Sequence, residues 1–424
     1  MFNFRIFLLI GDNMMEDRKS LLEIFGVKES YKLPDKILEY LLSDQAANKI
    51  TEVKNEGYTE IRDIFQEEQG DRKNLKQDFT PDCICQIIAE IMKEGDNIDM
   101  CSGTGALSKW ANKTRGIKIN EYEYSERTIP FALLDACVNG MMGTISRADC
   151  LRSEVFESYT LEKQEEISIP RQTSQKNPDQ YQNVIMNPPY SMKFPDTDDY
   201  EIYGWKIPKS KADFGFILRG VQHLKEDGRQ IAVLPHGILF RGAQEGKIRR
   251  WLIENHMISA VIGVPDKLFL NTSIPVFLLV IEHNSKDVLF IDASKEFIKK
   301  AAQNDMEEKH IEKVVNTFLN RKEVEKYSYI ASYKEIEEND FNLNIPRYVD
   351  SFEEEPLPDV RQILKNLKQI DEEETKIKAD LYSMLNDLTG SKEDMKVVEM
   401  HKNILKPKKP AKEVIGQLSF EGLL

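Results

Sequence analysis

The sequence predicts an α/β protein with a mostly parallel sheet, flanked by a helical region at each end. Short apolar runs alternate with amphipathic segments between residues 97 and 281. Two of these runs end directly in turn-forming sequences, at residues 99–105 and 187–190. In open α/β sheets ligands bind beyond the carboxyl ends of strands. We therefore expect a functional site where these two turns meet.

Length and composition limit the classes of protein that fit. The chain has 424 residues, enough for two or three domains, with 41% hydrophobic and 31% charged residues, as in globular proteins. Its net charge of -14 argues against a uniformly cationic nucleic-acid binder. The five cysteines form no paired framework, which predicts reduced thiols and a cytoplasmic protein. Cys83 and Cys85 are too close for a zinc half-site, so we expect no metal.

Three regions follow from the patterning. Residues 1–76 read as a helical N-terminal region, residues 77–350 as the domain that carries the site, and residues 351–424 as a linker, a long helix and a basic tail. The apolar run at the N-terminus is too short to span a bilayer, and no later run is long and apolar enough, so no membrane association is expected.

The first turn follows a short strand and opens a helix, which predicts the start of a Rossmann-like unit. Gly103 and Gly105 allow a ligand to approach the backbone closely. The third glycine of the dinucleotide fingerprint is missing, and no Gly-Lys-Ser/Thr follows to make a phosphate loop. The carboxylate of Asp99, just before the turn, suits a cationic ligand without phosphate. S-adenosylmethionine fits this description, and an ordinary strand-turn-helix is the alternative.

Two further acidic residues are candidates for cofactor contacts. Glu123 lies near the end of the second strand, where an acidic side chain takes ribose hydroxyls, although Glu121 and Glu126 compete for this role. Asp149 is placed to accept a hydrogen bond from an adenine amine of the cofactor. A helix or turn cap is an equally good interpretation of Asp149.

The second turn consists of Asn187, Pro188, Pro189 and Tyr190, after a short apolar strand. The prolines stiffen the turn and remove two N–H donors. An exocyclic amine on a ring is a poor nucleophile, and a site that methylates it needs acceptors for its two N–H bonds. Asn187 offers a side-chain carbonyl and Pro188 a backbone carbonyl, while Tyr190 offers a face for a flipped base. An ordinary strand-to-loop turn is the alternative.

Two neighbouring segments carry structural predictions. Phe79-Thr80-Pro81 precedes apolar residues at helical spacing, so Thr80 is expected to cap a helix and Pro81 to occupy its first position. Residues 152–182 are polar and rich in Glu, Gln and Ser, which predicts an irregular surface insertion.

Candidate DNA contacts follow the Asn-Pro-Pro-Tyr turn. Basic side chains interleaved with aromatic ones suit phosphate contact and base stacking, although a solvated loop has the same composition. The candidates are Lys193, Trp205, Lys206, Lys209, Lys211 and, in the block of residues 237–242, Arg241.

Apolar residues recur on a seven-residue repeat after the linker at residues 351–358, which predicts a coiled-coil or bundle seam. A helix that binds a partner is favoured over one that folds back on its own domain. The seam residues are Val360, Ile363, Leu367, Ile370, Ile377, Leu381, Met384 and Leu388.

Taken in order, these motifs resemble the N6-adenine DNA methyltransferases. The resemblance rests on Phe79-Thr80-Pro81, the 99–105 loop, Glu123, Asp149 and the 187–190 turn. Residues 234–242 and 342–348 are similar to the modification subunit of type I restriction–modification systems, and the likeness spans about residues 78–350. The N-terminal helical region looks short for that subunit.

The resemblance implies a Rossmann-like methyltransferase core that uses S-adenosylmethionine to methylate adenine N6 in DNA. It also implies a separate specificity subunit, which would bind the C-terminal helix, and a possible restriction subunit. The implied cofactor residues are Phe79, Thr80, Asp99, Cys101, Gly103, Gly105, Glu123 and Asp149, and the implied catalytic residues are Asn187, Pro188, Pro189 and Tyr190.

Two other classes of function stay open. A methyltransferase for a protein glutamine amide or an RNA base would also use Asn-Pro-Pro-Tyr, because those acceptors are planar amines as well. A non-catalytic DNA-binding or assembly subunit would need none of the cofactor residues, and the intact Asp99, Gly103, Gly105 and Asn187 argue against it.

Overall fold

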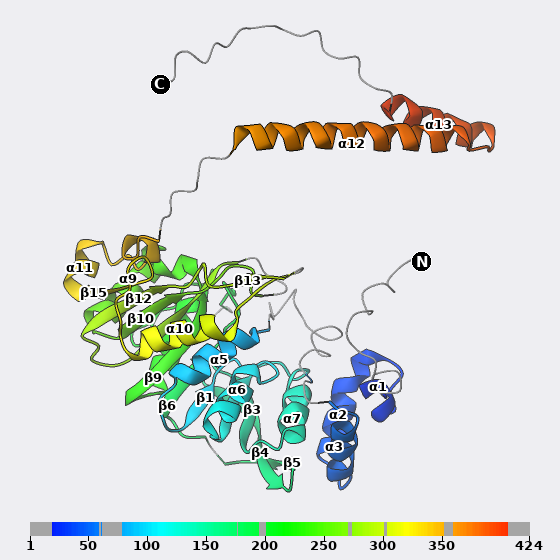
Figure 1. The fold of residues 1–424 in the computed structure, drawn as a ribbon. Coiled ribbons are helices and arrows are strands. Elements are labelled where there is room, and N and C mark those ends of the chain that lie inside the picture. The colour runs from blue at the N-terminus through cyan, green and yellow to red at the C-terminus, as the bar shows by residue number, and fades with distance from the viewer. Residues whose placement is uncertain are drawn as a thin grey trace. The chain divides into compact units, whose positions relative to one another are not determined.

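The chain forms two compact units, Met1–Phe352 and Glu353–Leu424 (Figure 1). The computed structural model describes residues 19–58, 61, 79–175, 177–194, 201–269, 274–300, 303–351 and 359–405. The predicted linker lies almost wholly outside these ranges, and the predicted basic tail lies beyond them.

An 11-stranded sheet organises the first unit. Its centre, β3-β2-β1-β6-β9, is parallel throughout, and antiparallel strands extend both sides. The predicted parallel sheet is therefore confirmed for the part that carries both turns. In spatial order the strands are β15 (Ser328–Ser332), β12 (Asp287–Asp292), β10 (Ile258–Gly263), β11 (Val276–Ile281), β9 (Leu224–Pro235), β6 (Tyr181–Met186), β1 (Asn97–Asp99), β2 (Ile119–Glu123), β3 (Gly143–Asp149), β4 (Glu154–Gln164) and β5 (Ile167–Thr173).

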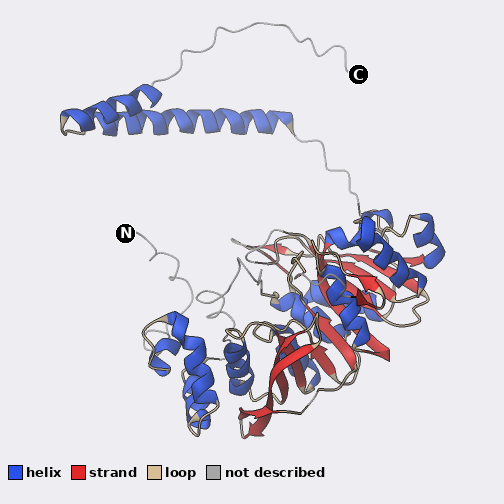
Figure 2. Ribbon diagram, turned by 180° about the vertical axis from the view of Figure 1, so that it is seen from behind, coloured by secondary structure: helices blue, strands red, loops and turns tan. Residues whose placement is uncertain are grey.

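Helices cover both faces of this sheet, so the central strands are buried on both sides (Figure 2). In β6, Ile185 packs with the helices of one face, whereas Val184 and Met186 pack with those of the other. The two-residue period of a strand produces this alternation, and it explains why the run is apolar throughout. One face carries α5 (Asp82–Ile91), α6 (Ala106–Arg115) and α10 (Glu308–Leu319), and the other carries α8 (Asp213–Gln222), α9 (Ala243–Glu254) and α11 (Tyr333–Glu338).

The strand order reverses at β1, which lies between β2 and β6. Asp99 at its end pairs in register with Glu121 of β2 and Ile185 of β6. The connection after β1 leads to α6 on one face, and the connection after β6 leads to α8 on the other. Connections that diverge in this way leave a crevice at the carboxyl ends of the strands.

Residues 152–182 are not the irregular insertion that their composition predicted. Strands β4 and β5 form an antiparallel hairpin that continues the sheet beyond β3. Tyr159 and Leu161 of β4 and Ile169 of β5 are buried, while charged side chains such as Glu162 and Arg171 are exposed. An antiparallel edge hairpin can expose one face to water, so its composition is that of a surface segment although its fold is regular.

The described part of the N-terminal region is helical, as predicted. Its helices share one core with α7 (Ile129–Val138) and the inner face of β3–β5. They are α1 (Leu21–Ile24), a 3-10 turn η1 (Ser30–Lys32), α2 (Leu33–Leu41) and α3 (Ala46–Asn55).

Short elements complete the first unit. They are the two-stranded sheets β7 (Glu201–Ile202) with β8 (Trp205–Lys206) and β13 (Ile298–Lys299) with β14 (Asn304–Asp305), and the 3-10 turns η2 (His236–Leu239) and η3 (Ile345–Arg347).

The second unit is a pair of helices, α12 (Val360–Asn386) and α13 (Lys392–Leu405), which contact each other. The predicted seam residues lie on α12 and just beyond it, and seven of them are exposed by 44–67%. These seven, the seam stripe, are Ile363, Leu367, Ile370, Ile377, Leu381, Met384 and Leu388. None of the described helices is long and apolar enough to cross a bilayer.

Candidate active site

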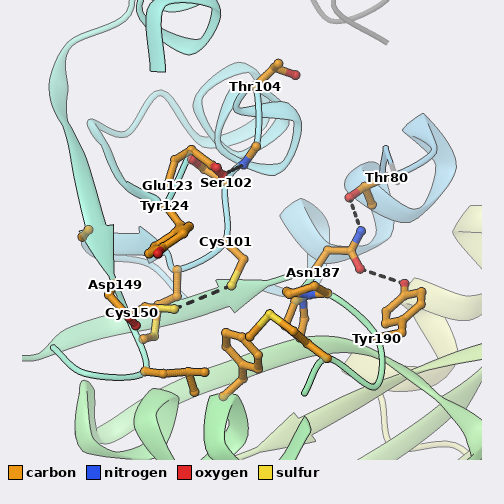
Figure 3. A pocket seen from close by; sticks show the side chains of 18 of the residues that line it. Thr80, Cys101, Ser102, Thr104, Glu123, Tyr124, Asp149, Cys150, Asn187 and Tyr190 are labelled. Carbon is orange, nitrogen blue, oxygen red and sulfur yellow. Dashed lines mark hydrogen bonds between the residues drawn. The ribbon is translucent and has the colours of Figure 1, made fainter. Parts of the chain in front are cut away.

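A cavity of about 320 Å³ lies at the carboxyl ends of β1, β2, β3 and β6, in the crevice that the strand order creates. It brings together the glycine-rich loop and the Asn-Pro-Pro-Tyr turn, which are far apart in sequence (Figure 3). Ten of the predicted cofactor and catalytic residues line it: Phe79, Thr80, Cys101, Gly103, Glu123, Asp149, Asn187, Pro188, Pro189 and Tyr190.

The glycine-rich loop is shaped by left-handed backbone at Gly103 (φ 57°) and Gly105 (φ 88°). A Cβ at Gly105 would lie 2.9 Å from Oε1 of Glu121, so glycine is required there for space as well as for conformation. Asp99 and Gly105 are not among the residues that line the cavity and lie behind the loop. The carboxyl of Asp99 accepts a hydrogen bond from the Cys101 N–H (3.2 Å) and thereby fixes the start of the loop.

Glu123 bridges the loop and the segment after β2. Its Oε2 accepts from the Gly103 N–H (2.9 Å) and its Oε1 from the Ser125 N–H (2.8 Å). Of the three acidic residues that compete in the sequence, Glu123 lines the cavity, Glu121 is buried behind Gly105 and Glu126 is exposed. Of these three acidic residues, only Glu123 is placed to meet a ligand in the cavity.

The carboxyl groups behind the loop are held in an environment that disfavours charge. Burial raises the pKa of Asp99 to about 8, and the nearby Glu123 adds to this. Burial likewise raises the pKa of Glu121 well above its usual range. Oδ2 of Asp99 and the buried Thr104 hydroxyl of the loop have no hydrogen-bond partner among the described residues, whereas the Glu121 carboxyl interacts with the hydroxyls of Ser108 and Ser102. Unpaired buried acceptors beside a cavity suit a ligand that brings donors or positive charge.

Asp149 serves as a turn cap and also faces the cavity (Figure 3). Its Oδ1 accepts from the Arg152 N–H (3.1 Å), and its Oδ2 lies 3.8 Å from Arg152 Nη1. The two interpretations of Asp149 are therefore compatible with each other.

Asn187 is held at both ends of its side chain. Its Nδ2 donates to Thr80 Oγ1 (2.9 Å), and its Oδ1 accepts from the Tyr190 hydroxyl (2.7 Å) (Figure 3). This arrangement fixes the amide orientation and aims the carbonyl oxygen, which keeps a second lone pair. The Tyr190 ring in turn packs edge-on against Phe269, with centroids 6.3 Å apart.

The predicted helix cap at Thr80 is wrong. Helix α5 begins at Asp82 with Pro81 as its N-cap, and no side chain caps it. The Thr80 hydroxyl instead receives the Asn187 amide, 107 residues further along the chain. A local sequence pattern carries no information on such a partner.

Several cavity residues were not singled out from the sequence. Tyr124 directly follows Glu123, and Cys150 directly follows Asp149, so proximity to a named acid was the available signal. Met192, Phe194 and Phe216 supply an apolar wall from the loop after Tyr190 and from α8. The Cys101 and Cys150 sulfur atoms are 3.8 Å apart and are free thiols.

The candidate DNA contacts are placed in different ways. Lys193 is exposed and lines the cavity, Lys206 and Lys209 are exposed, and Lys211 is half-buried. Trp205 packs against Trp251, with ring centroids 6.3 Å apart. Arg241 lies in a buried ion-pair cluster with Asp213 and Glu245.

Among the described residues, no group of three or more His, Cys, Asp and Glu side chains could hold a metal ion.

The sheet order, the acid-flanked glycine loop and the clamped Asn-Pro-Pro-Tyr turn define a Rossmann-like methyltransferase. A family model for N-6 DNA Methylase matches residues 58–356, and the chain belongs to this family.

Relatives agree with this assignment. The methylase subunit of the type I restriction enzyme MpnII from Mycoplasma pneumoniae is 27% identical over 327 residues, covering 73% of this chain and 60% of the relative. A type I restriction-modification methyltransferase subunit from Streptococcus thermophilus is 33% identical, with a TM-score of 0.60 over 76% of this chain and 69% of that structure. A modification subunit from Vibrio vulnificus shares the fold, with a TM-score of 0.53 at 16% identity over 81% of this chain and 74% of that structure.

The chain does not span the full length of its curated relatives. It matches 60% of the MpnII subunit and 53% of the MjaVIII methylase subunit from Methanocaldococcus jannaschii.

Proposed function

We propose that this protein transfers a methyl group from S-adenosylmethionine to the N6 amine of adenine in DNA, as the modification subunit of a type I-like restriction–modification system. The observation that carries the proposal is the clamped Asn187 side chain at the edge of a cavity lined by the glycine loop. Membership of the N-6 DNA Methylase family and the named relatives support it.

The residues around the cavity fit S-adenosylmethionine. The ligand carries a cationic ammonium and sulfonium and a ribose with two donors, and this side of the cavity has buried acceptors without partners. When bound, the cofactor supplies an electrophilic methyl group. We assign Glu123 to its ribose and Asp149 to its adenine, with Gly103 and Cys101 allowing close approach to the loop. Asp99 and Gly105 shape that loop from behind, and Phe79 and Thr80 close the cavity from the other wall.

The acceptor turn would act on a flipped adenine. Asn187 Oδ1 and the Pro188 carbonyl accept the two amine N–H bonds, which orients the nitrogen lone pair toward the cofactor side of the cavity. Pro189 stiffens the turn, and Tyr190 offers a stacking face while its hydroxyl holds Asn187. Fixed hydrogen-bond acceptors of this kind need no reorganisation as the amine reacts.

DNA affinity would come from local positive charge, because the chain as a whole carries a net charge of -14. We propose that Lys193, Lys206, Lys209 and Lys211 contact phosphates beside the cavity. The β7–β8 hairpin, which carries Trp205, lies in the same segment between β6 and α8. We propose that this hairpin contacts the DNA strand next to the flipped base.

We propose further that the seam stripe of α12 binds a specificity subunit, which would select the DNA site. The stripe is a run of seven exposed apolar side chains on and just beyond one long helix, a surface that suits a partner helix. A restriction subunit would join through that complex. We also propose a cytoplasmic location, where DNA is available and the five free thiols would stay reduced.

The deciding experiment is methyl transfer from labelled S-adenosylmethionine to genomic DNA that lacks adenine methylation, with the same DNA methylated beforehand as the control. It is run with the chain alone and with any co-purified partner. N6-methyladenine formed by the chain alone would identify a solitary enzyme, and formation only with the partner would support a modification subunit. Cofactor binding without any DNA product would favour a protein-glutamine or RNA acceptor. Absence of cofactor binding would favour a non-catalytic subunit.

A further inference from the structure

The backbone that follows Tyr190 is fixed by a buried carboxylate. Ser191 has left-handed backbone (φ 50°), and its N–H donates to Asp213 Oδ1 at 2.8 Å. Asp213 is the first residue of α8, and its side chain is 1% exposed. A carboxylate in the first turn of a helix accepts hydrogen bonds at a place where the helix dipole favours it.

Two backbone hydrogen bonds tie the rest of this loop to the segment before α8. The Ala212 N–H donates to the Met192 carbonyl (2.8 Å), and the Phe194 N–H donates to the Lys209 carbonyl (3.0 Å). The start of α8 and the acceptor turn therefore move together.

The second oxygen of Asp213 faces Arg241. Oδ2 lies 3.4 Å from Nη1 and 3.5 Å from Nη2 of Arg241, and Nη1 also lies 3.3 Å from Oε1 of Glu245. The side chains of Arg241, Asp213 and Glu245 are only 18%, 1% and 10% exposed, respectively. Gly237 makes room for the guanidinium, since a Cβ there would lie 2.5 Å from Arg241 Nε.

Arg249 holds the backbone that presents Arg241. Its Nη1 donates to the carbonyls of Ile238 (3.0 Å) and Arg241 (2.7 Å), and its Nε donates to the Phe341 carbonyl (2.9 Å). The block at residues 236–242 is thus joined to the segment that leads into residues 342–348. Residues 234–242 and 342–348, the two motifs that do not line the cavity, are therefore linked through Arg249.

We propose that Asp213 and Arg241 form a positioning pair, which sets the acceptor geometry of Asn187 and Tyr190 by fixing the backbone at Ser191. This inference rests on the proposed methyl transfer and gives Arg241 a different role from the DNA contact expected from the sequence. Because Tyr190 precedes Ser191 and holds Asn187 at 2.7 Å, a shift of the Ser191 amide misaligns the carbonyl that receives the amine. Arg241 acts through Asp213 and touches neither cofactor nor base.

The test compares Arg241→Gln, Arg241→Lys and Asp213→Asn with Arg250→Gln as the matched control. Arg250 lies on α9, is 56% exposed and pairs with Glu254, so it carries the same charge change without the buried contact. Single-turnover methyl transfer, cofactor affinity, and DNA affinity at several salt concentrations are measured on the full chain with its partner.

We expect a loss of roughly tenfold or more in the transfer rate for Arg241→Gln and Asp213→Asn, with cofactor and DNA affinity unchanged. The double variant Arg241→Gln with Asp213→Asn should transfer methyl groups no more slowly than the slower single variant, because both substitutions act on the Asp213–Arg241 contact. Arg241→Lys should recover part of the rate. A reduced salt slope of DNA binding at an unchanged transfer rate would instead make Arg241 a phosphate contact and overturn the proposal.

Amide hydrogen exchange separates failure of this inference from failure of the proposed function. Exchange in a peptide covering residues 187–194 should be faster in Arg241→Gln than in the wild type or Arg250→Gln, whatever the substrate. Equal exchange in all three proteins would refute the positioning role even if the wild type methylates DNA. Faster exchange with an inactive wild type would retain the positioning pair and reject the DNA reaction. Should Asp213→Asn fail to fold, Arg241→Lys gives the same comparison.

Discussion

At the scale of single residues, the site depends on acceptors whose orientation is imposed by neighbours. The side-chain amide of Asn187 is held in one orientation, because its Nδ2 donates to the Thr80 hydroxyl and its Oδ1 accepts from the Tyr190 hydroxyl. Asp99 is the opposite case, a carboxyl with one oxygen bonded and the other buried without a partner.

Replacing Asn187 with alanine should slow methyl transfer by about 100-fold or more, because an oriented acceptor is lost from the reacting amine. Cofactor affinity should stay within a factor of about two, since Asn187 does not belong to the glycine loop. Single-turnover transfer and a cofactor titration measure the two quantities. Asn255→Ala, at an exposed asparagine on the C-cap of α9, is the control. Normal turnover in Asn187→Ala would refute the assigned role.

Asp99→Asn should change how stability depends on pH. Unfolded Asp99 loses its proton near its ordinary pKa of 3.8, whereas in the folded, cofactor-free protein burial raises this pKa to about 8. Rising pH between these values therefore favours the unfolded chain, and stability falls across that window. The neutral asparagine removes this contribution, so urea unfolding at several pH values should give a shallower decline. Parallel curves for the two proteins would show that Asp99 ionises in the folded state as freely as in water.

At the scale of elements, the glycine loop approaches the adjacent strand at Gly105 too closely for a side chain. Gly105 is the N-cap of α6 and Gly116 its C-cap, and both have left-handed backbone. A Cβ at Gly105 would approach Glu121, whereas a Cβ at Gly116 would meet open space. A substitution at Gly116 would therefore introduce backbone strain alone, whereas one at Gly105 would add steric overlap.

We expect Gly116→Ala to lower the free energy of unfolding by about 1–2 kcal/mol through left-handed strain alone. Gly105→Ala should lower it by at least ~1 kcal/mol more, because overlap with Glu121 is added. Cofactor affinity should fall only in Gly105→Ala. Urea unfolding and a cofactor titration test both statements, and equal losses in the two variants would contradict the close approach to Glu121.

The sequence allowed good prediction of elements whose signal is local. The strand that leads into Asn187 and the turn at Gly103 could be read from short patterns, whereas the choice between Glu123, Glu121 and Glu126 stayed open. The Thr80–Asn187 bond and the Arg241 cluster could not, because their partners are joined only by the fold. The β4–β5 hairpin was missed because an edge hairpin with one wet face has the composition of a loop.

At the scale of the whole molecule, the two units present different surfaces. The first unit buries its apolar side chains in cores on both faces of the sheet. The second leaves the seam stripe exposed along α12. Tyr382 and Leu385, which lie off the stripe, are half-buried, and α12 contacts α13.

Ile370→Glu combined with Ile377→Glu should abolish co-purification of the specificity subunit, because two charges would be buried in the contact. The free energy of unfolding of the first unit should change by less than about 0.5 kcal/mol, since both side chains are exposed. Lys365→Glu with Lys368→Glu, on the exposed polar face of α12, is the charge-matched control. Retention of the partner by the stripe variant would place the contact elsewhere.

The position of β1 in the sheet has a consequence for synthesis on the ribosome. β1 and the glycine loop emerge early, but the strand that covers the free edge of β1 is β6, which arrives only with Asn187. The Arg241 segment emerges later still. A nascent chain halted between these points exposes a hydrogen-bonding edge and lacks the acceptor turn. The cavity is therefore complete only after most of the sheet has been made.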